Sequence, residues 1–224
     1  MTFHATIKNK LLIRLFLILS VALLLRVVML GRQSLWLDEF YSWIFASRDV
    51  RHVLHSEPAN PPFYFLLLHF WIRWFGTSES ALRSLGIVPS LLSVWLVYHF
   101  SSRLFNRGIA YLAAIYQSVS TFQIYYAQDA RCYSLLVSIL FLATLCLWNA
   151  LEEHSPRRYL YYGAYALLGA LALYTHYIST FFLAGHGLYV LFRRPKQILA
   201  AGSSLAVSVI LFSNQSKYVG VVGV

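Results

Sequence analysis

The chain has 224 residues, of which 59% are hydrophobic and only 12% are charged, and its mean hydropathy is +0.61. A soluble domain carries roughly twice that charged fraction, so the composition excludes an ordinary soluble protein and indicates several membrane-spanning helices. The net charge of +10 would suggest nucleic acid in a soluble protein, but Lys and Arg collect in the cytoplasmic loops of membrane proteins, and we expect no nucleic-acid partner.

Seven apolar segments are predicted to cross the membrane. The first follows basic residues, as a signal peptide would, but it is long, lacks a small-residue cleavage site and precedes further spans, so we interpret it as retained. The segments are residues 11–30, 84–102, 108–127, 132–151, 159–178, 179–192 and 197–213. Cys132 and Cys146 share one of them without metal-ligand spacing and are predicted to be packing residues. We therefore predict an all-α transmembrane bundle over residues 1–213 and an irregular tail at 214–224.

One further apolar segment, residues 61–76 (PPFYFLLLHFWIRWFG), is short for a span and typical of a helix that lies on the membrane surface. If it lies on the surface, every short basic cluster faces the cytoplasm together with the N-terminus. If it spans, the last three clusters move outside, against the positive-inside bias. The clusters are Lys8, Lys10 and Arg14, then Arg103 and Arg107, then Arg157 and Arg158, and finally Arg193, Arg194 and Lys196. The charge pattern therefore favours the surface position.

With this topology, residues 31–83 form one long external loop that holds the surface segment 61–76 and five of the eight acidic residues. The short connections at 125–133 and 175–177 face the same side. The unusual polar residues of the chain therefore converge on the external face, where we predict a site.

Asp38 and Glu39 begin that loop, in the stretch LWLDEFYSW at residues 35–43. Acids are favoured in the first turn of a helix, and this alone could explain the pair. The alternative is a carboxylate held at the lipid boundary as a general base or a metal ligand, because ionisable groups at membrane depth are costly and usually functional. Both interpretations stay open at this point.

Asp129 and Arg131 lie between two spans in the stretch YYAQDARCYSLL at residues 125–136. Arg131 is the only basic residue of the later external loops, contrary to the charge bias, and a guanidinium there could bind a phosphate in bidentate fashion. An ion pair of Arg131 with Asp129 or with Asp38 is the structural alternative. If a divalent metal is bound, Asp38 and Asp129 are its candidate ligands.

Other polar residues of the external face have structural explanations that compete with a functional one. His176 lies at an external helix end and is a weaker candidate than the acids. Asn60, before two prolines, could contact a ligand or cap a turn. Glu79 and Arg83 are four residues apart, which favours an ion pair within one helix.

These motifs together resemble a known family. LDEFYSW is followed by NPPFYFLLLHFWIRWFGTSESALRSLGIVPSL, then by RLFNRGIAYLAAIYQSVSTFQIYYAQDARCYSLL and finally by THY. In order and separation they resemble the polyprenyl-phosphate-sugar-dependent glycosyltransferases of the GT-C fold, in particular the protein-mannosyltransferase-like group, glycosyltransferase family 39. The similarity covers about residues 11–195.

The resemblance implies a GT-C-like bundle whose first external loop carries two membrane-parallel helices. It implies an inverting sugar transfer with Asp38 as general base and Glu39 in support. It also places the donor phosphate or lipid near Asp129, Arg131 and Tyr133, and we add Asn60 and His176 to this group. The implied partners are a polyprenyl-phosphate-linked sugar, a glycan, lipid or protein acceptor, and membrane lipids, with no certain cofactor beyond a possible divalent metal.

Two other function classes compete with this one. A transporter or flippase would need ionisable residues at mid-membrane and broken helices in paired halves, which the sequence does not show. A non-catalytic lipid-binding fragment is the other alternative, since members of the family usually have more spans and the end of this chain suggests truncation. We expect a bacterial inner-membrane protein with a cytoplasmic N-terminus and an external active site.

Overall fold

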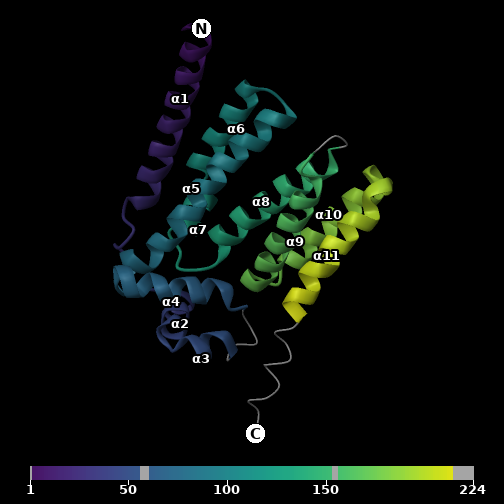
Figure 1. Cartoon of the computed structure of the whole chain (residues 1–224). Helices are drawn as coiled ribbons and strands as arrows, with labels where there is room; N and C mark the ends of the chain where they lie inside the picture. Colours follow the sequence, from purple (N-terminus) through teal and green to yellow (C-terminus); the bar gives the residue numbers. More distant parts are fainter. Residues whose placement is uncertain (1, 56–60, 153–155, 214–224) are drawn as a thin grey trace.

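The structure is a computed structural model that describes residues 2–55, 61–152 and 156–213 (Figure 1). In these ranges the chain forms α-helices and one short 3-10 helix, with no strand, which confirms the predicted all-α membrane bundle. The helices are α1 (Thr2–Val27), α2 (Leu37–Ser47), α3 (Val50–His55), α4 (Phe63–Phe75), α5 (Glu79–Leu104), α6 (Arg107–Val119), α7 (Thr121–Ala127), α8 (Tyr133–Leu151), α9 (Arg158–Thr175), α10 (Ser179–Arg193), η1 (Pro195–Gln197) and α11 (Ile198–Ser213).

Three helical segments of the described chain are each long and apolar enough to cross a membrane. They are α5, α8 and the continuous segment Pro195–Ser213. Helices α1, α6, α9 and α10 run beside them in the same bundle, and each coincides with an apolar segment expected from the sequence (Figure 1). The number of seven spans stays a prediction.

The segment predicted as one span at 108–127 is two helices. α6 ends at Val119, Ser120 adopts a non-helical conformation, and α7 begins at Thr121. The break leaves the last carbonyls of α6 without donors from their own helix. Arg26, fully buried on α1, donates to two of them, at 2.9 Å to the Ser118 oxygen and 3.3 Å to the Gln117 oxygen.

Helix α4 lies across the end of the bundle instead of along it, with α2 and α3 beside it (Figure 1). The ring of Phe45 on α2 packs edge-on against Phe65 on α4, with centroids 5.0 Å apart. His69 on α4 is buried, and its Nδ1 is 2.8 Å from the Ala46 oxygen of α2. A short apolar helix across the end of a bundle is the arrangement expected of a segment at the membrane surface.

The two ends of the bundle differ in character. The connections α7–α8 and α9–α10 lie at the same end as α2–α4, while the connections α5–α6 and α10–α11, the end of α8 and the start of α9 lie at the opposite end (Figure 1). The opposite end carries the arginine and lysine clusters from Arg103 onward. The polar residues singled out from the sequence therefore gather at one end, as expected, while the orientation of this end in a membrane stays a prediction.

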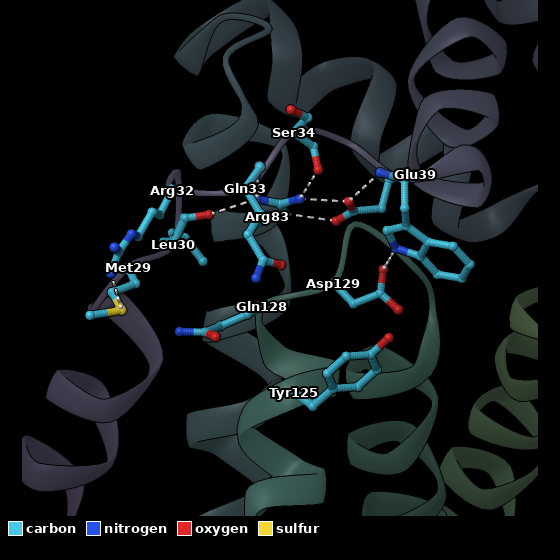
Figure 2. A pocket seen from close by; sticks show the side chains of 11 residues that line it. Met29, Leu30, Arg32, Gln33, Ser34, Glu39, Arg83, Tyr125, Gln128 and Asp129 are labelled. Atoms are coloured by element: carbon cyan, nitrogen blue, oxygen red, sulfur yellow. Dashed lines mark hydrogen bonds and ion pairs between the residues drawn. The ribbon is translucent and has the colours of Figure 1, made fainter.

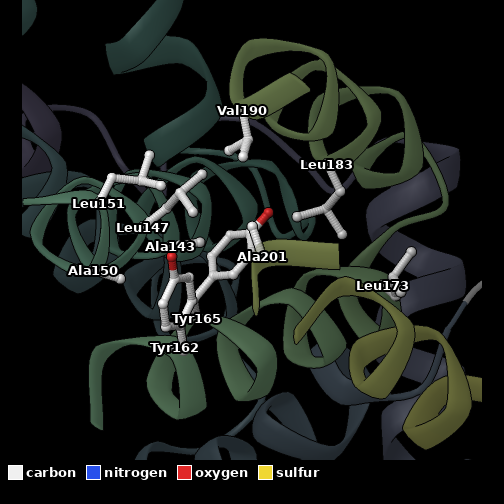
Figure 3. Close-up of a cluster of buried hydrophobic side chains, with 10 residues drawn as sticks. All are labelled: Ala143, Leu147, Ala150, Leu151, Tyr162, Tyr165, Leu173, Leu183, Val190 and Ala201. Atoms are coloured by element: carbon white, nitrogen blue, oxygen red, sulfur yellow. The ribbon is translucent and has the colours of Figure 1, made fainter. Parts of the chain in front are cut away.

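The second half of the chain has its own apolar core between α8, α9, α10 and α11 (Figure 3). Small residues allow the helices to approach closely, as is common in membrane bundles. The core residues are Ala143, Leu147, Ala150, Leu151, Tyr162, Tyr165, Leu173, Leu183, Val190 and Ala201. This core supports α8 and α9, whose lower ends carry part of the candidate site.

Candidate functional site

Glu39 is a buried carboxylate whose hydrogen bonds are all made within the protein. It accepts from Arg83 Nε at 2.8 Å and from Arg83 Nη2 at 2.7 Å, which is a bidentate ion pair. It also accepts the backbone N–H of Ala130 at 3.0 Å and that of Trp36 at 3.3 Å. Burial alone would raise the pKa of Glu39, but the bonds from Arg83, Ala130 and Trp36 hold that pKa below its ordinary value.

Arg83 ties the first loop to the bundle. Its Nη1 donates to the carbonyl oxygens of Leu30 and Gln33, at 3.0 and 2.8 Å, and its Nη2 donates to that of Ser34 at 3.1 Å. Figure 2 shows the chain of residues 30–34 wrapped around the guanidinium. The ion pair expected between Arg83 and Glu79 is therefore wrong: the spacing allowed it, but Glu39 offers a buried, bidentate partner.

Asp38, next to Glu39, has a different environment. Its side chain is 43% exposed, and its Oδ2 lies 3.8 Å from Nη2 of Arg131, which is 14% exposed. Arg131 Nη1 is also within 3.5 Å of the Asp38 carbonyl oxygen. Of the two pairings left open for Arg131, the structure has the one with Asp38. The two adjacent acids thus separate into a structural carboxylate and an accessible one.

Asp129 is a buried acid only 3% exposed. Its Oδ1 accepts a hydrogen bond from Trp36 Nε1 at 3.3 Å, and its Oδ2 has no hydrogen-bond partner among the described residues. Burial, and then the negative charge of Glu39, raise the pKa of Asp129 to about 6, although Trp36, Arg131 and Arg83 oppose this. Asp129 therefore titrates near neutral pH, which is common at functional sites.

Tyr133 and His176 lie together beside this group. Their ring centroids are 5.9 Å apart, and Tyr133 also packs edge-on against Tyr126 at 4.8 Å. His176 Nδ1 accepts the N–H of Ile178 at 3.1 Å. Burial and the positive charge of Arg131 lower the pKa of His176.

A pocket of about 820 Å³ opens between the first loop and the connection from α7 to α8 (Figure 2). This volume is in the range of about 300–1,000 Å³ that is usual for small-molecule sites. Its lining residues are Met29, Leu30, Arg32, Gln33, Ser34, Trp36, Glu39, Arg83, Tyr125, Gln128 and Asp129. Asp38 and Arg131 do not line it, so the site has two parts that meet at Trp36 and Asp129.

Two other predictions concern Asn60 and a metal. Asn60 lies outside the described residues. Within the described residues, no three His, Cys, Asp or Glu side chains lie close enough together to hold a metal ion. Asp38 and Asp129, the candidate metal ligands, therefore have no third such ligand in that part of the chain.

The structure adds Gln128 and Gly86, which the sequence interpretation did not single out, and it gives the contacts of Trp36, one of the aromatic residues around Asp38 and Glu39. Trp36 and Gln128 hold the two sides of the pocket together: the Gln128 amide donates to the carbonyl oxygens of Arg26 and Val28, at 3.1 and 2.8 Å, and so caps the end of α1. Gly86 on α5 allows the turn at Ala127 to approach, because a Cβ there would lie 2.7 Å from the Ala127 oxygen. In the sequence, Gln128 and Gly86 were recognisable as an amide next to Asp129 and as a glycine inside an apolar segment.

The described helices form a membrane bundle in which two buried acids, two ion-paired arginines and a pocket gather at one end, as is common for the ligand sites of membrane proteins. The chain belongs to the dolichyl-phosphate-mannose-protein mannosyltransferase family, whose model matches residues 59–216, more than two thirds of the sequence. This is a family of membrane glycosyltransferases that use a lipid-linked sugar. The matched region contains Arg83, Asp129 and Arg131 and begins after Asp38 and Glu39. Comparison with curated proteins gave no match.

Proposed function

We propose that this protein moves a sugar from a polyprenyl-phosphate donor to an acceptor on the external face of the membrane, with inversion at the anomeric carbon and Asp38 as the general base. Membership of a mannosyltransferase family supports the reaction class. The observation that carries the choice of base is the contrast between the two adjacent acids. Glu39 has its acceptor positions filled by Arg83 and backbone N–H groups, while Asp38 is 43% exposed.

The reaction requires a proton acceptor and a group that stabilises the leaving phosphate. The Asp38 carboxylate takes the proton of the acceptor hydroxyl, whose oxygen attacks the anomeric carbon from the face opposite the phosphate. The bond from carbon to phosphate oxygen breaks, and the electron pair leaves with the polyprenyl phosphate. The sugar enters between Asp38 and Arg131, which are 3.8 Å apart in the free protein, so that Arg131, only 14% exposed, contacts the phosphate on the far face and stabilises its growing negative charge.

The remaining site residues have supporting roles in this proposal. Glu39 and Arg83 hold residues 30–34 and the start of α2 in place. Tyr133 and His176 provide aromatic surface next to Arg131, where the lipid end of the donor enters from the membrane. The site faces outside, the N-terminus faces the cytoplasm, and the membrane is a bacterial inner membrane.

The test replaces Asp38 by Asn in the full chain, assayed in membranes with polyprenyl-phosphate mannose as donor. Transfer falls about a hundredfold or more, because the amide cannot accept the proton. Asp49→Asn is the matched control: Asp49 is another exposed acid of the same loop, and its carboxylate only accepts the His52 N–H at 2.8 Å. Wild-type transfer by Asp38→Asn would refute the assignment of the base, and retention of the anomeric configuration in the product would refute inversion.

A further inference from the structure

The pocket of about 820 Å³ has features that the proposed chemistry leaves unexplained. The base Asp38 and the cation Arg131 do not line it, whereas Asp129 does. Asp129 is 3% exposed, and its Oδ2 has no hydrogen-bond partner among the described residues. A buried polar atom without a partner is costly, and in a native protein it often marks the place of a ligand.

The chemistry of this oxygen limits the ligand. A carboxylate oxygen is a hydrogen-bond acceptor, so its partner must be a donor or a cation. A phosphate would be repelled. For a metal ion, the described residues offer no group of three His, Cys, Asp or Glu side chains. A hydroxyl group is the donor that remains in a family whose substrates are sugars.

The rest of the lining suits a sugar. Trp36 and Tyr125 are 45% and 59% exposed, so their ring surfaces are available to a ligand. Figure 2 shows the Asp129 carboxylate near the Tyr125 side chain, and Trp36 Nε1 donates to Asp129 Oδ1 at 3.3 Å. A pyranose has apolar faces of C–H groups that pack on aromatic rings and a rim of hydroxyl groups that bind carboxylates and amides. The neighbouring Gln33 and Ser34 supply further polar side chains.

The charged floor of the pocket does not compete for this ligand. Glu39 and Arg83 also line it, but they satisfy each other at 2.7 and 2.8 Å. The Nε1–H of Trp36 holds the Asp129 carboxyl by one oxygen, and the other oxygen is buried at the pocket wall without a partner among the described residues. The geometry is therefore that of a single fixed acceptor beside two aromatic rings.

We propose that this pocket is a sugar subsite, in which Asp129 accepts a hydrogen bond from a pyranose hydroxyl and the rings of Trp36 and Tyr125 cover an apolar face of the sugar. This inference rests on the proposed function and places the sugar of the transfer reaction in this pocket. The sugar belongs either to the donor or to a glycan acceptor, whose chemistry is the same. The position of Asp129 two residues before Arg131 connects the subsite directly with the proposed phosphate contact.

Binding is measured without turnover, by saturation-transfer NMR of methyl α-mannopyranoside with the full chain purified in detergent. Asp129→Asn weakens binding about tenfold or more, because a hydrogen bond to a charged group is replaced by a weaker one. Tyr125→Leu also weakens binding, because it removes a ring that covers the sugar. Tyr125 is 59% exposed, so this change leaves the fold intact. Asp49→Asn is the control and binds as wild type does. Unchanged binding by Asp129→Asn would overturn the inference, and so would Mn²⁺ binding that Asp129→Asn abolishes.

Two further measurements separate the possible failures. In transfer assays, Asp129→Asn raises the KM for the donor if the donor sugar occupies the pocket, or the KM for the acceptor if the acceptor glycan does; both results support a sugar subsite. Asp38→Asn binds methyl α-mannopyranoside like the wild type. If Asp38→Asn still transfers sugar, the proposed function fails while the binding result stands. If Asp129→Asn binds normally and Asp38→Asn is inactive, only the subsite fails.

Discussion

Arg83 and Glu39, 44 residues apart in the sequence, form a bidentate ion pair with N–O distances of 2.8 and 2.7 Å in the buried floor of the pocket. Five more contacts complete this unit: Arg83 donates to the carbonyl oxygens of Leu30, Gln33 and Ser34, and Glu39 accepts the N–H groups of Trp36 and Ala130. One pair of side chains therefore joins the first loop, α2, α5 and the connection to α8.

Breaking this pair destabilises the protein strongly. Glu39→Gln leaves the Arg83 guanidinium buried without its counter-charge, and removing one partner of a buried pair costs about 3–5 kcal/mol. Thermal unfolding in detergent measures the loss. Arg73→Gln is the control, because Arg73 is an exposed arginine on α4 whose replacement should change stability by about 0.5 kcal/mol or less. Equal stability of Glu39→Gln and Arg73→Gln would show that the pair does not hold the loop.

Arg26 stabilises the break between α6 and α7. Its guanidinium donates to the Ser118 and Gln117 oxygens and, through Nε, to Ser90 Oγ at 2.7 Å. Arg26→Leu leaves these acceptors buried and unsatisfied, at about 1–3 kcal/mol each, so the unfolding midpoint falls. Arg14→Leu on the same helix is the comparison, since the Arg14 guanidinium lies over the Tyr111 ring, 5.7 Å from its centroid. If the Arg14 change costs as much, the capping role is wrong.

The sequence predicted the fold and the convergence of the site from local signals. Apolar runs gave the helices, and the distribution of basic residues correctly placed residues 31–83 at the same end as Asp129 and His176. The partner of Arg83 could not be predicted, because the i to i+4 rule considers one helix only and the actual partner is on another. For the same reason the role of Glu39 could not be separated from that of Asp38 before their contacts were known.

Other parts of the site depend on two segments of the backbone lying close together, which is harder to predict from a sequence. The pocket forms because the turn at Ala127 lies against α5, and this needs the absence of a side chain at Gly86. The break at Ser120 divides an unbroken apolar run, so a hydropathy profile shows a single span. The sequence led us to expect the donor phosphate or lipid near Asp129, and that stays a prediction. The burial of the carboxyl beside Trp36, which supports our proposal of a sugar subsite, has no local signal in the sequence.

Gly86→Ala tests that close approach. The new methyl group would lie 2.7 Å from the Ala127 oxygen and 3.5 Å from the Asp129 oxygen, and backbone atoms do not yield easily. Overpacking of this kind costs about 1–3 kcal/mol, more than the gain of about 1 kcal/mol in helix propensity. We expect lower thermal stability together with weaker binding of methyl α-mannopyranoside, because the turn that carries Asp129 is displaced.

Gly163→Ala is the matched control for this change. A Cβ at Gly163 on α9 would meet no atom within 4 Å, so only the helix propensity changes and stability stays equal or rises slightly. If Gly86→Ala behaves in the same way, the turn does not depend on the small residue.

The pH dependence of stability gives an independent test of Asp129. Its pKa of about 6 in the folded protein lies above the ordinary value of 3.8, so between these values the folded state binds a proton that the unfolded state does not. Stability from this group is therefore present at low pH and is lost as the pH rises through 6. The groups facing the carboxyl are Glu39, which raises its pKa, and Trp36, Arg131 and Arg83, which lower it without cancelling the effect of burial.

Asp129→Asn removes this titration and keeps an oxygen for the Trp36 N–H. We therefore expect the variant to be more stable than the wild type at pH 7, to keep about half of that advantage at pH 5 and to lose it below about pH 4. Thermal unfolding between pH 4 and pH 7 measures this, with Asp49→Asn as the control. A structural carboxylate would behave in the opposite way, and lower stability of Asp129→Asn at pH 7 would contradict the prediction. A residue whose replacement stabilises the fold but weakens sugar binding is kept for its ligand, because natural sites commonly trade stability for function.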